Sequence, residues 1–172
     1  MPDLDWDSVK GFFTAYYLGD NPEGFVPDCT LAEWEKLFDF LRSGGWRHEY
    51  LIDAGHYNRT EPLPYSPREP MRRNAREECS AMLKVWPEPS LLVWFWVEQE
   101  TRVRFDVSFY KLEHQAGLDA VCGFLGTLGR LLGKPVYFGE HDAVPDSGEG
   151  GGGPVLEFDL AGGRVVVSGA VG

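Results

Sequence analysis

The sequence lacks the features that mark secreted, membrane-embedded or disulfide-stapled proteins. It begins with neither the basic stretch nor the apolar stretch of a signal peptide. No apolar run approaches the roughly 18 residues that a membrane span needs. Cysteine is scarce, and Cys29, Cys79 and Cys122 are far apart with no CxxC pair, which disfavours a disulfide framework. We therefore expect a cytoplasmic protein with reduced thiols, and no membrane association.

Positive charge is also in short supply. The 172 residues hold 16 Lys and Arg against 27 Asp and Glu, for a net charge of -11. Residues 1–66 hold 12 acids and 5 bases, residues 67–135 hold 9 and 10, and residues 136–172 hold 6 and 1. A field of this sign disfavours binding to nucleic acid or to an anionic membrane. It suits a basic protein partner, and it equally suits an acidic protein kept soluble by like charge.

Linear catalytic and cofactor motifs are missing as well. The sequence contains no GxSxG, HExxH or GxGxxG. The stretch 129–135 departs from a P-loop in its glycine spacing and in Pro135, which stands where Ser or Thr would hold magnesium. The four histidines have no metal-ligand spacing, and residues 140–142 (Glu-His-Asp) are interpreted as a solvated turn. We expect no metal and no cofactor.

Two thiols and two carboxylates are the candidates for chemistry. Cys29 is the more exposed thiol by sequence, whereas Cys122 lies on an apolar helix face. Glu98 and Asp106 could approach across a hairpin as an acid/base pair. A small enzyme with a site at these two carboxylates is therefore one alternative.

What the sequence does contain is the patterning of an antiparallel sheet. Residues 91–97, LLVWFWV, predict a central strand that is buried on both faces. Stretches 80–86 and 102–109 flank it through short polar links, which predicts a three-strand meander. Further strands are predicted at 46–52, 135–138, 155–160 and 164–168.

Helices are predicted from apolar periodicity and from end signals. The first begins at Asp5 or Asp7 and fades near Gly19. Capping boxes at 30–33 and 66–69 open the second helix, which ends at Gly44, and a short third helix that reaches about Glu78. A fourth spans 117–132, where Gly123, Gly126 and Gly129 are expected to let the helix approach the sheet closely. Residues 19–28 and 55–70 are predicted as loops.

These elements predict a single α+β domain with a mainly antiparallel sheet and helices packed on one face. We divide the chain into an N-terminal helical segment (1–45), a sheet-and-helix core (46–138), a glycine-rich loop (139–154) and a C-terminal hairpin (155–169).

The candidate partner-binding residues all lie in predicted loops. Tyr57, Arg59 and Tyr65 belong to a proline-rich loop and are side-chain types that dominate interface energetics. Acidic residues in two further loops could steer a basic partner. They are Asp20, Glu23, Asp28, Glu140, Asp142 and Asp146. Ordinary solvated loops remain the alternative interpretation.

The chain also resembles uncharacterised actinobacterial proteins that look like immunity proteins of polymorphic toxins. The resemblance rests on Trp34-x-x-Leu37-Phe38, on Gly44-Gly45-Trp46, on the meander and on the LxxVCGFLxxLGRLLGKPV segment. It implies non-catalytic binding of one cognate toxin through acidic residues, as a monomer or homodimer. From the third helix onward the element order is also similar to type III secretion chaperones, which are acidic dimers. The N-terminal elements and the glycine-rich loop depart from that pattern.

Overall fold

The fold is described from a computed structural model of the chain, which places residues 4–13, 21–55, 58–108, 113–139 and 154–168. The described elements comprise four helices and nine strands. In chain order they are α1 (Trp6–Phe13), β1 (Glu23–Val26), α2 (Leu31–Arg42), β2 (Arg47–Asp53), β3 (Asn58–Glu61), α3 (Arg68–Ala75), β4 (Ser80–Glu88), β5 (Leu91–Trp96), β6 (Val103–Val107), α4 (Gln115–Leu132), β7 (Val136–Gly139), β8 (Pro154–Asp159) and β9 (Arg164–Val167).

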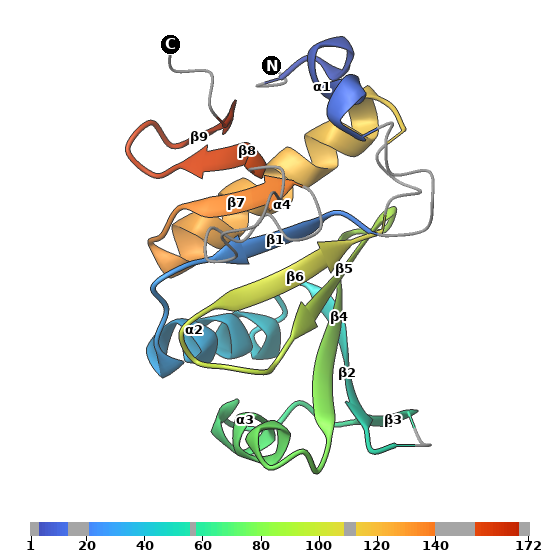
Figure 1. The fold of residues 1–172 in the computed structure, drawn as a ribbon, viewed down its shortest axis with the longest axis vertical. Helices are drawn as coiled ribbons and strands as arrows, with labels where there is room; N and C mark the ends of the chain where they lie inside the picture. The colour runs from blue at the N-terminus through green and yellow to red at the C-terminus, as the bar shows by residue number, and fades with distance from the viewer. Residues whose placement is uncertain (1–3, 14–20, 56–57, 109–112, 140–153, 169–172) are drawn as a thin grey trace.

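All nine strands form one antiparallel sheet in the order β3-β2-β4-β5-β6-β1-β7-β8-β9 (Figure 1). The predicted meander is present as β4-β5-β6, and β7-β8-β9 forms a second one. The α+β class and the mainly antiparallel sheet are thus confirmed.

The predicted loop at residues 19–28 is wrong, because it contains β1. This four-residue strand lies in the interior of the sheet, between β6 and β7. A β-carbon added at Gly24 would lie 2.2 Å from the Phe105 ring, so only glycine fits at this point of the strand. The predicted loop at residues 55–70 likewise contains the edge strand β3.

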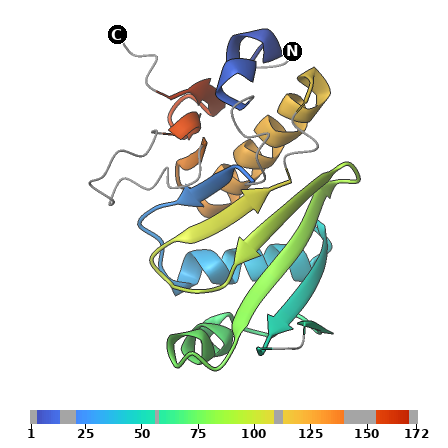
Figure 2. The ribbon, with the colours of Figure 1, turned by 45° about the vertical axis from the view of Figure 1, so that its right-hand side comes forward.

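The helices cover one face of the sheet, as predicted (Figures 1 and 2). Between them lies an aromatic core in which Phe124 of α4 packs against Phe95 and Phe105, at ring-centroid distances of 6.0 and 5.0 Å. Phe105 also stacks on Phe138 of β7 at 6.3 Å. The side chains of β4, β5 and β6 that point to this face are fully buried.

The second helix begins and ends where its sequence signals predict. Thr30 and Glu33 form the reciprocal capping box, with the Thr30 amide donating to the Glu33 carboxylate at 2.7 Å. The second predicted box does not form. Helix α3 starts one residue later than expected, after Pro67, which makes no side-chain cap, although the Arg68 amide does donate to Ser66 Oγ at 3.3 Å.

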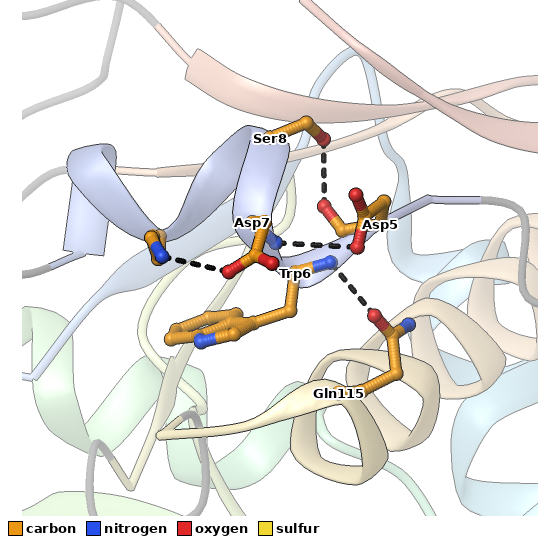
Figure 3. A network of polar contacts seen from close by, with 6 residues as sticks. Asp5, Trp6, Asp7, Ser8 and Gln115 are labelled. Atoms are coloured by element: carbon orange, nitrogen blue, oxygen red, sulfur yellow. Dashed lines mark hydrogen bonds and ion pairs between the residues drawn. The ribbon is translucent and has the colours of Figure 1, made fainter.

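The first helix is tied to the last one by hydrogen bonds at its N-terminus (Figure 3). Asp5 caps α1 by accepting the Asp7 amide at 3.3 Å, which confirms one of the two predicted caps. Gln115 of α4 accepts the Trp6 amide at 2.7 Å and donates to the Leu4 carbonyl at 2.8 Å. The Gln115 side chain therefore links the backbone groups before and at the first residue of α1. The predicted end near Gly19 lies outside the described residues.

The glycines of α4 differ in what surrounds them. A β-carbon at Gly129 would lie 2.1 Å from a ring carbon of Phe158 in β8, so α4 does approach the sheet closely there. At Gly123 nothing lies within 4 Å, and at Gly126 the nearest atoms belong to the end of the flexible Arg130 side chain. The expected close approach is thus confirmed at one of the three glycines.

Candidate functional site

The sheet face opposite the helices carries three partly exposed tryptophans. Within the described residues no helix covers this face (Figures 1 and 2). We call it the helix-free face. Trp86, Trp94 and Trp96 point to it and are half-buried, because they alternate with the fully buried residues of β4 and β5. The prediction that residues 91–97 are buried on both faces is therefore wrong: one face is core and the other is partly exposed.

Side chains on the helix-free face line up in rows because the strand register is continuous. One row runs through Met82, Trp96, Arg104, Phe25 and Tyr137, each opposite the next on the neighbouring strand. The rings of Phe25 and Tyr137 stack with their centroids 5.3 Å apart. Cross-strand neighbours of this kind are in direct contact, so the row is continuous, and within it Phe25 is only 4% exposed.

The next row carries side chains of both charge signs around one of the tryptophans. It runs through Glu49, Lys84, Trp94, Asp106 and Glu23. On one side of Trp94 the row continues with Lys84 and then Glu49, and on the other side with Asp106 and then Glu23. Such a row offers hydrogen-bond donors and acceptors next to apolar area.

Each of the three tryptophans has a cation from a neighbouring strand over its ring. The cation-to-centroid distances are 4.3 Å for Arg47 over Trp86, 4.5 Å for Lys84 over Trp94 and 5.5 Å for Arg104 over Trp96. Each contact contributes about 0.5–1 kcal/mol at an exposed site. These contacts favour defined orientations of the three rings.

Arg104 forms ion pairs with two carboxylates on this face. Its guanidinium lies 3.1 Å from the Glu23 carboxylate and 3.6 Å from that of Glu98. Glu23, predicted to steer a partner from a loop, is instead only 9% exposed and belongs to β1. The register places Trp94, not Glu98, opposite Asp106. The suggested Glu98–Asp106 pair is thus not brought together, and Asp106 is the cross-strand neighbour of Glu23.

Burial also affects a tyrosine at the end of the first row. It raises the pKa of the Tyr137 phenol above its ordinary value, and the neighbouring Glu157 carboxylate adds to the effect. The Tyr137 hydroxyl is hydrogen-bonded to the carboxylate of Glu157, its cross-strand neighbour on β8.

The loop candidates from the sequence are placed apart from this face or not described. Arg59 is exposed on β3 and pairs with Glu61 in the same strand. Tyr65 is 89% exposed, with the Arg42 guanidinium 5.1 Å from its ring centroid. Asp28 is exposed with a positive φ of 53°, and its carbonyl accepts a hydrogen bond from Lys134 at 2.7 Å. The remaining candidates lie outside the described residues: Asp20, Tyr57, Glu140, Asp142 and Asp146.

The three thiols are buried or half-buried. Cys29, the predicted exposed candidate, is 5% exposed, and burial raises its pKa, which disfavours the nucleophilic thiolate. Cys79 is buried and Cys122 half-buried. The described residues include no group of three or more potential His, Cys, Asp or Glu ligands placed to hold a metal ion.

The structure also has a polar depression at one end of the sheet, with a volume of about 330 Å³. It lies between the end of β2, the start of β4 and the turn after α3. Its lining comprises Asp53, Gly55, Asn74, Glu77, Glu78, Cys79 and Ser80. The lining offers few apolar contacts, unlike a typical small-molecule site.

Comparison with known proteins adds no relative to this description. No family model, no curated protein and no solved structure matches the chain. None of the described helices has the length and apolar character that crossing a membrane requires.

Sequence reasoning missed the helix-free face for an identifiable reason. The cations over the tryptophans come from neighbouring strands, and only the strand register reveals them. The one available signal was the strict alternation around the central strand, with Lys84 on one side of it and Arg102, Arg104 and Asp106 on the other. A run buried on both faces would have apolar partners on both sides.

Proposed function

We propose that this chain is a non-catalytic acidic binding protein that recognises a protein partner with its helix-free face. The partner we propose is a basic toxin domain, which the chain neutralises in the cytoplasm. The observation that supports this most is the group of three half-buried tryptophans, each with a cation over its ring, on a sheet face without a helix. Tryptophan and arginine are the residues that most often dominate binding energy at protein interfaces.

The physical state of the face favours protein recognition. Its rings are already oriented by Arg47, Lys84 and Arg104, so binding immobilises few additional side chains. Its acids and bases are interspersed over short distances, which favours a partner with a complementary pattern over a uniformly charged polymer.

Long-range electrostatics favour a basic partner. A net charge of -11 accelerates the encounter with a positively charged domain, and salt screens this attraction. The proposal therefore includes an association rate that falls steeply as ionic strength rises.

The competing proposals differ in what they require of the same molecule. A dimeric chaperone or adaptor would bind several unrelated substrates, and a small enzyme would convert a substrate near Asp106. The toxin-binding proposal instead requires one partner that is harmful when produced alone.

The test has two arms. The tagged chain is used to capture proteins from its source organism, and the captured partner is then expressed alone and together with the chain. We expect one basic domain that arrests growth alone and is harmless with the chain. A captured domain that is harmless alone would overturn neutralisation.

The surface is tested separately with Trp94→Ala and Tyr65→Ala. Tyr65 is the better exposed ring and was the anchor expected from sequence, so it provides a matched control. We expect Trp94→Ala to weaken binding of the captured partner by about 2 kcal/mol, a factor of roughly 30, and Tyr65→Ala to have little effect. The reverse result would overturn the helix-free face as the binding surface. Thermal melting of both variants checks that the fold is retained.

A further inference from the structure

The two edges of the nine-stranded sheet are built differently. One edge, β3, presents Asn58, Arg59, Thr60 and Glu61, with the arginine and the glutamate paired along the strand. The other edge, β9, reads Arg164-Val165-Val166-Val167 and carries no charge after its first residue. Charged side chains on an edge strand discourage pairing with another chain, and an uncharged β-branched edge permits it. After Arg164, the β9 edge therefore lacks the charged side chains that protect the β3 edge.

The backbone of β9 has hydrogen-bonding groups that point outward from the sheet and can pair with a further strand. Ser168 donates its amide to the Val155 carbonyl at 2.8 Å, and the register pairs Val166 with Glu157. Because inward and outward groups alternate along an antiparallel strand, the amides and carbonyls of Val165 and Val167 point away from β8. These two residues form the outward hydrogen-bonding positions of the sheet edge.

We propose that a second copy of this chain docks on this edge, with β9 pairing antiparallel to β9 about a two-fold axis at Val166. In this register Val165 of each copy lies opposite Val167 of the other, and each such pair exchanges two backbone hydrogen bonds. Val166 faces its own copy across the axis, and Arg164 faces Ser168.

The charge pattern favours this occupant. No like charges oppose one another along the shared strands, although each copy carries a net charge of -11. Pairing of β9 with the β3 edge of another copy would instead build an open-ended filament. The charged side chains of β3 disfavour that arrangement, which leaves the closed two-fold pair. The pairing leaves the tryptophans of the helix-free face uncovered, so it is independent of the function proposed above.

The experiment is sedimentation of the full chain over a concentration series from micromolar to millimolar, with two β9 variants and one control. Val167→Pro removes an outward amide while leaving the hydrogen bonds to β8 in place, since proline is tolerated at edge strands. Val166→Lys places two like charges opposite each other at the axis. Thr60→Lys makes the same kind of change on the β3 edge.

We expect the wild-type chain and Thr60→Lys to shift from one to two chains in mass as concentration rises. Both β9 variants should weaken this association at least tenfold, and higher salt should strengthen the wild-type association by screening the net charge. Circular dichroism checks the fold of each variant, so that Val166→Lys decides the matter should Val167→Pro unfold. A wild-type chain that stays single at every concentration would overturn the proposal, as would an association that neither β9 variant weakens.

Discussion

Replacing Gly129 with alanine should destabilise the protein, whereas the same replacement at Gly123 should stabilise it. Both residues lie in α4, and neither has a positive φ, so the intrinsic gain in helix propensity is the same, about 1 kcal/mol. What differs is the space for the new β-carbon. Gly123 has nothing within 4 Å, but Gly129 has Phe158 ring carbons at 2.1 and 2.6 Å.

The size of the effect at Gly129 follows from that clash. The Phe158 side chain is 0% exposed and lies in the core, so it cannot move aside into solvent. Overpacking of this kind destabilises by about 1–3 kcal/mol, and a clash this close belongs at the upper end of that range. After the propensity gain is subtracted, Gly129→Ala should lower the free energy of unfolding by about 2 kcal/mol. Gly123→Ala should raise it by up to about 1 kcal/mol.

Urea denaturation of the two variants beside the wild type measures both values. In thermal melts, a chain of this size shifts by about 2–4 °C per kcal/mol. The free energies of unfolding of the two variants should therefore differ by about 3 kcal/mol, with Gly129→Ala below the wild type and Gly123→Ala above it. If both variants changed the free energy of unfolding by the same amount and with the same sign, the close packing of α4 on β8 would be refuted.

Three further predictions concern single side chains. Burial raises the pKa of Tyr50 from 10.0 to about 12. The free energy of unfolding should therefore be unaffected by this group below pH 10 and should fall by up to about 2–3 kcal/mol between pH 10 and 12. In urea unfolding measured over a pH series, Tyr50→Phe should reduce the fall between pH 10 and 12. Gln115→Ala removes both hydrogen bonds to the start of α1, and amide exchange in α1 should accelerate at least tenfold while exchange in β5 is unchanged. Arg104→Met removes the 3.1 Å ion pair with the Glu23 carboxylate and should lower the free energy of unfolding by about 1–3 kcal/mol. The loss should be smaller in a Glu23→Gln background, and equal losses in both backgrounds would contradict the pairing.

Local signals in the sequence predicted the helices best. Helix α2 follows from the Thr30–Glu33 box and from the spacing of Trp34, Leu37 and Phe38, all of which act within a few residues. The α4 helix follows from its apolar period and from Gly133, whose φ of 64° ends it in the left-handed region. Such signals are complete within one segment of chain.

Strand β1 could not be predicted in this way. It has only four residues, includes Gly24, and follows Pro22. Its place depends on pairing with β6 and β7, which come some 80 and 110 residues later in the chain. Glu23 was consequently assigned to a loop, although it belongs to the interior of the sheet.

The exposure of the central strand β5 also could not be predicted from its sequence alone. An unbroken apolar run has the same appearance whether its second face is covered by helices or by cations from neighbouring strands. The contacts that Lys84 and Arg104 make with Trp94 and Trp96 depend on register, which the sequence alone does not give. The candidate site therefore moved from the loops to the sheet.

Hydroxyl-radical footprinting of the chain with and without its captured partner tests whether recognition occurs on the helix-free face. We expect oxidation of Trp86, Trp94 and Trp96, which are half-buried in the free chain, to fall sharply in the complex. Tyr65 and Phe12, at 89% and 47% exposure, should be oxidised equally in both states. Protection of Tyr65 with unchanged oxidation of the three tryptophans would contradict the claim and return recognition to the proline-rich loop.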